Sequence, residues 1–215
     1  MNNIKDKNFV GGVSFKMYII TILIAFLCHS PLYYIMYKEK QEKAIVNNNN
    51  KELVSTIKSE VRSKKAIKFL RALAFKESSN RYDIVSPSGN YFGAYQMGRI
   101  AFKELGFNID SYGIKKFLNN PSLQDSLIIE LLKVNKKYLS SYIKKYKGKI
   151  INDIKITESG LLAGGNMGIG YVMTFLKSNG DTIPSDGNNT PVTRYIKDLS
   201  GYDMSFLSMS VNKLF

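Results

Sequence analysis

A single glutamate at the end of an apolar helical pattern is the residue whose type and position best suit acid catalysis. The residues three, four, seven and ten positions before Glu77 are Ala74, Leu73, Leu70 and Ile67. Glu77 is therefore predicted to lie on the apolar face of a helix over 64–79. A carboxyl group there is poorly solvated when charged, so its pKa should rise toward the range that a general acid needs. The alternative is an ordinary glutamate that ends a helix in solvent.

A glycine- and tyrosine-rich loop follows about twenty residues later. Residues 86–90 have the composition of a turn, and residues 91–98 read Tyr-Phe-Gly-Ala-Tyr-Gln-Met-Gly. Glycine allows a backbone to approach a ligand closely, and Gln96 offers both a donor and an acceptor. Aromatic faces stack on sugar rings, so the loop suits a sugar held beside an acid. The alternative is an aromatic loop packed on the core.

Three short motifs occur in order along the chain. They are Glu77-Ser78, Gly93-Ala-Tyr-Gln-Met97, and Leu161-Leu-Ala-Gly-Gly-Asn-Met-Gly-Ile-Gly-Tyr171. Together they resemble the motifs of the lysozyme-like lytic transglycosylase superfamily, and the resemblance covers roughly residues 65–204. Gly165 precedes Asn166 where many members have a tyrosine, and Tyr171 is a candidate replacement for that aromatic contact.

The resemblance implies a mainly α, lysozyme-like catalytic domain over 64–215 that cleaves peptidoglycan without a metal or another cofactor. Glu77 would protonate the MurNAc–GlcNAc β-1,4 oxygen and then, as a carboxylate, remove the proton from the muramoyl 6-hydroxyl to give a 1,6-anhydro end. The residues that the resemblance assigns to sugar binding are Ser78, Tyr95, Gln96, Met97, Asn166, Tyr171 and Tyr195.

Two alternatives use the same fold differently. A muramidase would need a second carboxylate, for which the candidates are Asp83, Glu158 and Asp186. Each has an ordinary role as well, because Asp83 and Asp186 suit turns and Glu158 suits the first turn of a helix capped by Thr157. The second alternative is a non-catalytic envelope protein that binds glycan or serves as a scaffold.

Residues 17–37 form an apolar stretch without Lys, Arg, Asp or Glu. About twenty such residues can cross a bilayer as a helix, which predicts a signal anchor after a short cytoplasmic N-terminus, 1–16. A cleaved signal peptide is the alternative. Residues 38–63 are polar and predict a tether. These features predict a single-pass protein of the bacterial inner membrane, with its domain on the extracytoplasmic side.

The chain carries a formal net charge of +14. A basic protein would be attracted to the anionic polymers of the wall and the anionic lipids of the inner membrane. We expect peptidoglycan strands as the partner and no nucleic acid, since no recognition motif occurs; a partner in an envelope machine is left open. The only cysteine and histidine are Cys28 and His29, which excludes an intrachain disulfide and a histidine-based triad in the domain.

The remaining periodicity is helical. Asn120-Pro121 predicts a helix start, and an apolar face at threes and fours continues from it to Tyr146. Further helices are predicted over 98–106, 111–118, 157–177 and 191–199. Strand signals are limited to short pieces around 83–96.

Overall fold

A computed structural model describes residues 31–209 of the chain, and this part is mainly helical. Its contacts divide the chain into two units, Met1–Thr56 and Ile57–Phe215. The predicted cytoplasmic N-terminus, 1–16, and most of the predicted anchor, 17–37, lie outside the described residues. Within the described part, no helix has an apolar stretch long enough to cross a membrane.

The first helix described, α2, spans Pro31–Ser78. The prediction of a helix over 64–79 is therefore right at its end and wrong at its start, because the segment predicted as a tether, 38–63, is helical throughout. Its polar sequence lacks the apolar periodicity that identifies a helix packed on a core. The end of α2 belongs to the second unit, where Leu70, Leu73 and Ala74 are buried, whereas Ile67 is 37% exposed.

Two residues with left-handed backbone, Ser79 and Asn80, terminate α2. The chain then forms a minimal antiparallel pair, β1 (Tyr91–Phe92) with β2 (Met97–Gly98). Between them, the backbone of Gly93 has a φ of +70° and lies so close to the Gln124 side chain that a Cβ atom would clash. Gly93 therefore allows the loop to pack tightly on the helix that carries Gln124.

Helices α3 (Arg99–Glu104), α4 (Ser111–Leu118) and α5 (Pro121–Tyr138) follow. The Asn120 side chain accepts a hydrogen bond from the Leu123 N–H, which confirms the predicted cap of α5. The prediction of one apolar face continuing to Tyr146 fails at Leu139, where the backbone leaves helical geometry before α6 (Ser140–Tyr146).

The last part of the chain contains a short hairpin, two packed helices and a 3-10 turn. Strands β3 (Ile150–Ile151) and β4 (Ile154–Lys155) precede α7 (Glu158–Lys177) and α8 (Val192–Asp198), and η1 spans Ser205–Ser208. Thr157 caps α7 as predicted, by accepting from the Gly160 N–H. Helix α7 kinks at Gly168, whose backbone is not helical.

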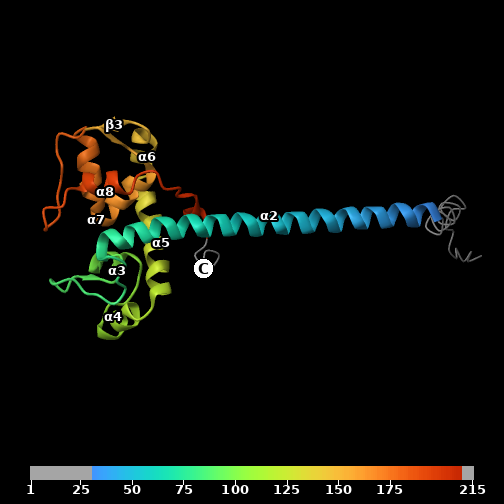
Figure 1. The fold of residues 1–215 in the computed structure, drawn as a ribbon, viewed down its shortest axis with the longest axis horizontal. Coiled ribbons are helices and arrows are strands. Elements are labelled where there is room, and N and C mark those ends of the chain that lie inside the picture. Colours follow the sequence, from blue (N-terminus) through green and yellow to red (C-terminus); the bar gives the residue numbers. More distant parts are fainter. Residues whose placement is uncertain (1–30, 210–215) are drawn as a thin grey trace, which may run out of the picture. The chain divides into compact units, whose positions relative to one another are not determined.

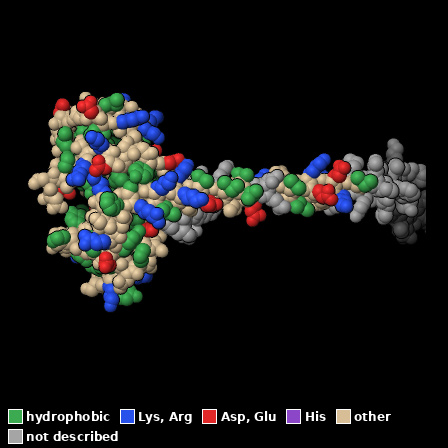
Figure 2. Space-filling view, in the orientation of Figure 1, with side chains coloured by type: hydrophobic (Ala, Val, Ile, Leu, Met, Phe, Trp, Pro, Cys, Tyr) green, Lys and Arg blue, Asp and Glu red, His purple; other side chains and the backbone are tan. Residues whose placement is uncertain are grey.

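Within the second unit, α5 connects two groups of elements (Figure 1). Figure 1 shows α3 and α4 near one end of α5 and α6, α7 and α8 near the other, with the end of α2 between the groups. One contiguous core joins them, and it includes Phe69, Tyr95 and Leu132. Figure 2 shows Lys and Arg side chains spread over the visible face of this unit, among hydrophobic and fewer acidic ones.

Candidate active site

The Glu77 carboxylate is held by one side chain from α7 and one from α8. Asn166 donates from Nδ2 to Glu77 Oε1 at 2.8 Å, and Tyr195 donates from its hydroxyl to Glu77 Oε2 at 3.1 Å. Glu77 is partly buried in the last turn of α2. Three helices that are distant in sequence therefore converge on one carboxyl group.

Burial is the main influence on the protonation of this group. It raises the pKa of the Glu77 carboxyl to about 7, although the hydrogen bonds from Asn166 and Tyr195 and the charge of Lys76 act in the opposite direction. The negative charge of Asp186 adds a smaller increase to the same pKa. Near neutral pH the site therefore holds an acid and its conjugate base in comparable amounts, as acid–base catalysis requires. This confirms the predicted direction of the shift.

Asn166 is fixed by a second contact. Its Nδ2 also lies 3.4 Å from the backbone oxygen of Tyr95, so the amide connects α7 to the loop between β1 and β2. Asn166 is thus a predicted site residue that the structure brings into direct contact with Glu77.

The side chains of Tyr95 and Met97 are in the core, each 1% exposed. The Tyr95 hydroxyl donates to Asp125 Oδ1 at 2.6 Å, and burial raises its pKa further above the usual range. Tyr95 therefore contributes its backbone oxygen to the site, whereas its ring supports the loop from inside.

Ser78 is also buried, at 5% exposure. Its hydroxyl lies 2.8 Å from the Ala94 oxygen and accepts from the Arg81 N–H at 3.0 Å. Ser78 thus connects the end of α2 to the loop between β1 and β2 through a hydrogen bond. In this geometry the Ser78 hydroxyl contacts the backbone of the loop, and the sugar-binding role that the resemblance implied stays a prediction.

A cleft of about 550 Å³ opens beside Asn166. Gln96 lies in it, with Nε2 donating to the Gly93 oxygen at 2.8 Å. Exposed aromatic rings of Tyr91 and Tyr138 border it from β1 and α5. The other lining residues are Asn90, Met97, Gly98, Arg99, Ile100, Ala101, Glu104, Leu131, Gly165, Met167, Gly168 and Ile169.

A second cavity, of about 490 Å³, borders Tyr195 and the adjoining Lys76, Arg194 and Asp198. Asn166 lines one cavity and Tyr195 lines the other, and both donate to the same carboxylate. Glu77 itself lines neither of these two cavities, so a ligand in either one would meet its hydrogen-bond donors, Asn166 or Tyr195. Tyr171, which is 36% exposed, lines neither of these two cavities.

The three candidates for a second carboxylate lie in different settings. Asp83 is exposed. Asp186 Oδ1 accepts from the N–H groups of Asn188 and Thr190, as a turn residue would, yet its charge also acts on Glu77. Of the three, Asp186 is the one electrostatically connected to Glu77.

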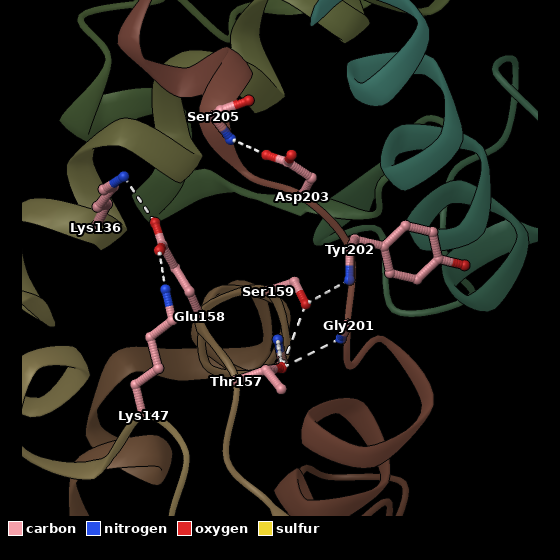
Figure 3. A network of polar contacts seen from close by, with 10 residues as sticks. Lys136, Lys147, Thr157, Glu158, Ser159, Gly201, Tyr202, Asp203 and Ser205 are labelled. Atoms are coloured by element: carbon pink, nitrogen blue, oxygen red, sulfur yellow. Dashed lines mark hydrogen bonds and ion pairs between the residues drawn. The ribbon is translucent and has the colours of Figure 1, made fainter.

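Glu158 belongs to a separate network, shown in Figure 3. Lys136 lies 2.7 Å from Oε1 and Lys147 lies 3.4 Å from Oε2. Burial would raise the pKa of Glu158, but these two lysines outweigh it and hold the pKa below its usual value. Asn166 follows Glu158 by eight residues on α7, about 12 Å along the axis, so Glu158 sits well away from the Glu77 site.

Two residues that support the site were not predicted. Gln124 is fully buried; its Oε1 accepts from the Ala94 N–H, and its Nε2 donates to the Tyr82 and Phe117 oxygens. Asp125 accepts from both Tyr82 and Tyr95. Both polar residues follow Leu123 in an amphipathic helix, and nothing in one sequence distinguishes them from solvent-facing residues.

Comparison of the chain with models of protein families, with curated proteins and with solved structures found no match.

Proposed function

We propose that this protein is a peptidoglycan-cleaving glycosidase of the lytic transglycosylase type, with Glu77 as its acid and base. One observation carries the proposal: a partly buried carboxyl group with a pKa of about 7 accepts hydrogen bonds from two neutral donors, and each donor lines a different cavity. The three sequence motifs that resemble the lysozyme-like superfamily contribute Glu77, the loop around Gln96, and Asn166.

In the first step, protonated Glu77 donates its proton to the glycosidic oxygen while the bond from that oxygen to C1 breaks. Positive charge develops at C1 and the ring oxygen, and the N-acetyl oxygen of the same sugar stabilises it. One positioned general acid typically accelerates such a step by roughly 10²- to 10⁴-fold. The pKa of about 7 makes the protonated form available near neutral pH.

In the second step, the Glu77 carboxylate accepts the proton of the muramoyl 6-hydroxyl while that oxygen bonds to C1. The product is a 1,6-anhydro ring, and Glu77 regains the proton that it lost. Asn166 and Tyr195 serve both steps, because their hydrogen bonds keep the two carboxylate oxygens in place. The exposed rings of Tyr91 and Tyr138 suit stacking on sugars in the cleft.

The proposed location is the outer side of a bacterial inner membrane, with residues 17–37 as the anchor. The net charge of +14 supports attraction to anionic lipids and wall polymers. The proposed partner is the glycan strand itself.

A two-carboxylate muramidase is the second candidate, and the influence of Asp186 on the Glu77 pKa favours it. In that mechanism Asp186 would activate water or act as the nucleophile, depending on its distance from Glu77 in the complex. The products then carry reducing ends instead of anhydro ends.

The products distinguish these mechanisms. Full-length protein, its Glu77→Gln variant and its Asp186→Asn variant are each incubated with purified peptidoglycan, and the released muropeptides are analysed by mass spectrometry. The proposal expects anhydro products, one water lighter than hydrolysis products, from the wild type and from Asp186→Asn but not from Glu77→Gln. Reducing-end products that require Asp186 would replace it with the muramidase. Full activity in Glu77→Gln would reject both mechanisms.

A further inference from the structure

Lys76, the residue before Glu77, is unusually buried for a lysine. Its side chain is only 14% exposed, and its Nζ lies 2.6 Å from Asp198 Oδ2. Lysine is rarely buried unless its charge is paired. The pairing partner therefore accounts for the position of this ammonium group next to the site.

The same ammonium group also contacts Tyr195. Lys76 Nζ lies 4.7 Å from the centre of the Tyr195 ring, within the range of a cation–π interaction. Asp198 follows Tyr195 by three residues on α8, so the two side chains lie one turn apart on the same face. Lys76 is thus bound to one residue of α8 and lies over another.

Consecutive residues at the end of α2 therefore contact the two ends of one side chain. Lys76 lies against the ring of Tyr195, whereas Glu77 accepts from its hydroxyl at 3.1 Å. Asp198 holds the lysine through an ion pair, and Arg194 forms a longer ion pair with the same carboxylate, with Nε 3.8 Å from it.

We propose that Lys76 is a positioning residue, which with Asp198 holds Tyr195 in hydrogen-bonding contact with Glu77. The inference rests on the proposed acid–base role of Glu77. Lys76 also lines the second cavity, but in this role it acts through the tyrosine.

Lys65 offers a control on the same helix, with a side chain that is 36% exposed, against 14% for Lys76. Lys65 lies 2.6 Å from Asp203 Oδ2, the distance seen for Lys76 and Asp198. Lys65 also connects α2 to the C-terminal part of the chain, but its pair involves neither Glu77 nor Tyr195. Removing Lys65 therefore measures what the loss of a similar ion pair does to stability alone.

Charged groups around Glu77 set the direction of the pH effect. Lys76 lowers its pKa and Asp186 raises it, while Arg194 acts on Tyr195. Loss of the Lys76 charge and loss of the Tyr195 hydrogen bond would both raise the pKa of Glu77. The alkaline limb of the pH–rate profile, where the acid loses its proton, should therefore move to higher pH in a Lys76→Met variant.

The test combines kinetics on solubilised peptidoglycan with variants of the full chain. Lys76→Met should reduce kcat/KM by roughly tenfold, the scale of one lost hydrogen bond, whereas Lys76→Arg should restore most of it and Lys65→Met should leave it unchanged. In a double-mutant cycle, Lys76→Met should add little to Tyr195→Phe, because both remove the same contact. Additive losses, or full activity in Lys76→Met, would overturn the inference.

A second readout requires no substrate. An NMR titration of the Glu77 carboxyl should give a higher pKa in Lys76→Met than in the wild type, with a smaller increase when the background is Tyr195→Phe. Equal increases in both backgrounds, or none, would contradict a role through the tyrosine. A wild type that cleaves no glycan would reject the proposed function, and this titration would still decide the role of Lys76.

Discussion

The chain contains two Glu-Ser pairs, and the pKa values of their glutamates are shifted in opposite directions. Glu77-Ser78 ends α2 and Glu158-Ser159 begins α7. Both glutamates are partly buried, and both serines are almost fully buried. The pKa of Glu77 is nevertheless raised to about 7, whereas that of Glu158 is lowered.

The deeper burial of Glu77 and the different partners of the two glutamates together explain the difference. Glu77 accepts from an amide and a phenol, and no ion pair to it occurs within residues 31–209. Glu158 is paired with two lysines. The neutral donors cancel only part of the rise in pKa that burial causes at Glu77, whereas the two lysines more than cancel the rise that burial causes at Glu158. A dipeptide motif therefore identifies an acid only when no cation is paired directly with its carboxylate.

The largest expected effect concerns activity. Glu77→Gln keeps the shape of the side chain but removes the transferable proton, so glycan cleavage should fall by roughly 10²-fold or more. Glu158→Gln removes the other glutamate in the same way and should retain most of the wild-type rate. Muropeptide release by the two variants at equal concentrations measures both. Comparable losses in the two variants would remove the distinction between the sites.

The next largest effect concerns stability against pH. From pH 4.5 to about 7, the folded Glu77 carboxyl keeps a proton that the unfolded chain has released, so the free energy of unfolding falls as pH rises. The shift corresponds to roughly 3 kcal/mol once both states are ionised. Glu77→Gln has no carboxyl group at this position and therefore lacks this fall in the free energy of unfolding. It should be more stable than the wild type above pH 7.

Glu158 should change the free energy of unfolding with pH in the opposite direction. Its lowered pKa stabilises the fold at pH values above the ordinary carboxyl pKa, and this stabilisation is lost as pH falls. Glu158→Gln should therefore be less stable than the wild type at neutral pH, by about 1 kcal/mol for a partly exposed pair, and equal to it in acid. Urea unfolding of the three proteins between pH 4 and 8 measures these differences. Parallel curves for the wild type and Glu77→Gln would contradict the raised pKa.

Asn166→Ala tests the contribution of the neutral donors themselves. It removes the bond to Glu77 Oε1 and the contact with the Tyr95 oxygen. We expect kcat/KM to fall by roughly tenfold and the alkaline limb of the pH–rate profile to move to higher pH, because the lost bond lowered the pKa of Glu77. An alkaline limb that moved to lower pH would contradict this account.

The smallest effect is expected at the two serines. Ser78 bonds the Ala94 oxygen, and Ser159 accepts from the Tyr202 N–H at 3.1 Å. Ser78→Ala and Ser159→Ala should each lower the free energy of unfolding by about 1 kcal/mol, measured by urea unfolding. Only Ser78→Ala should also reduce kcat/KM, by a few-fold, because Ala94 adjoins the Tyr95 oxygen that contacts Asn166.

Local signals in the sequence predicted much of the second unit. The cap residues Asn120 and Thr157 marked two helix starts correctly, and Leu70, Leu73 and Ala74 placed Glu77 on a buried face. The start of α2 was missed because its polar residues form a helix without an apolar stripe. The break at Leu139 was missed because the apolar stripe continues across it.

The site was only partly predictable, for a physical reason. Asn166 and Tyr195 were named from the resemblance, since periodicity within one helix says nothing about which residues of other helices face it. The lysine pairing of Glu158 is likewise a tertiary feature, because Lys136 precedes it by more than twenty residues. By contrast, a local feature such as the turn between β3 and β4 can be read from its residue types, because Asn152 and Asp153 both adopt positive φ there and such residues tolerate it.

The most direct test is a titration of both glutamates in the wild-type protein, by NMR of their labelled carboxyl carbons across pH 3 to 9. We expect Glu77 to titrate with a pKa of about 7 and Glu158 with a pKa below its usual value. If Glu77 instead titrated at or below 4.5, it would be fully ionised at neutral pH, and the proposed acid would lack its proton.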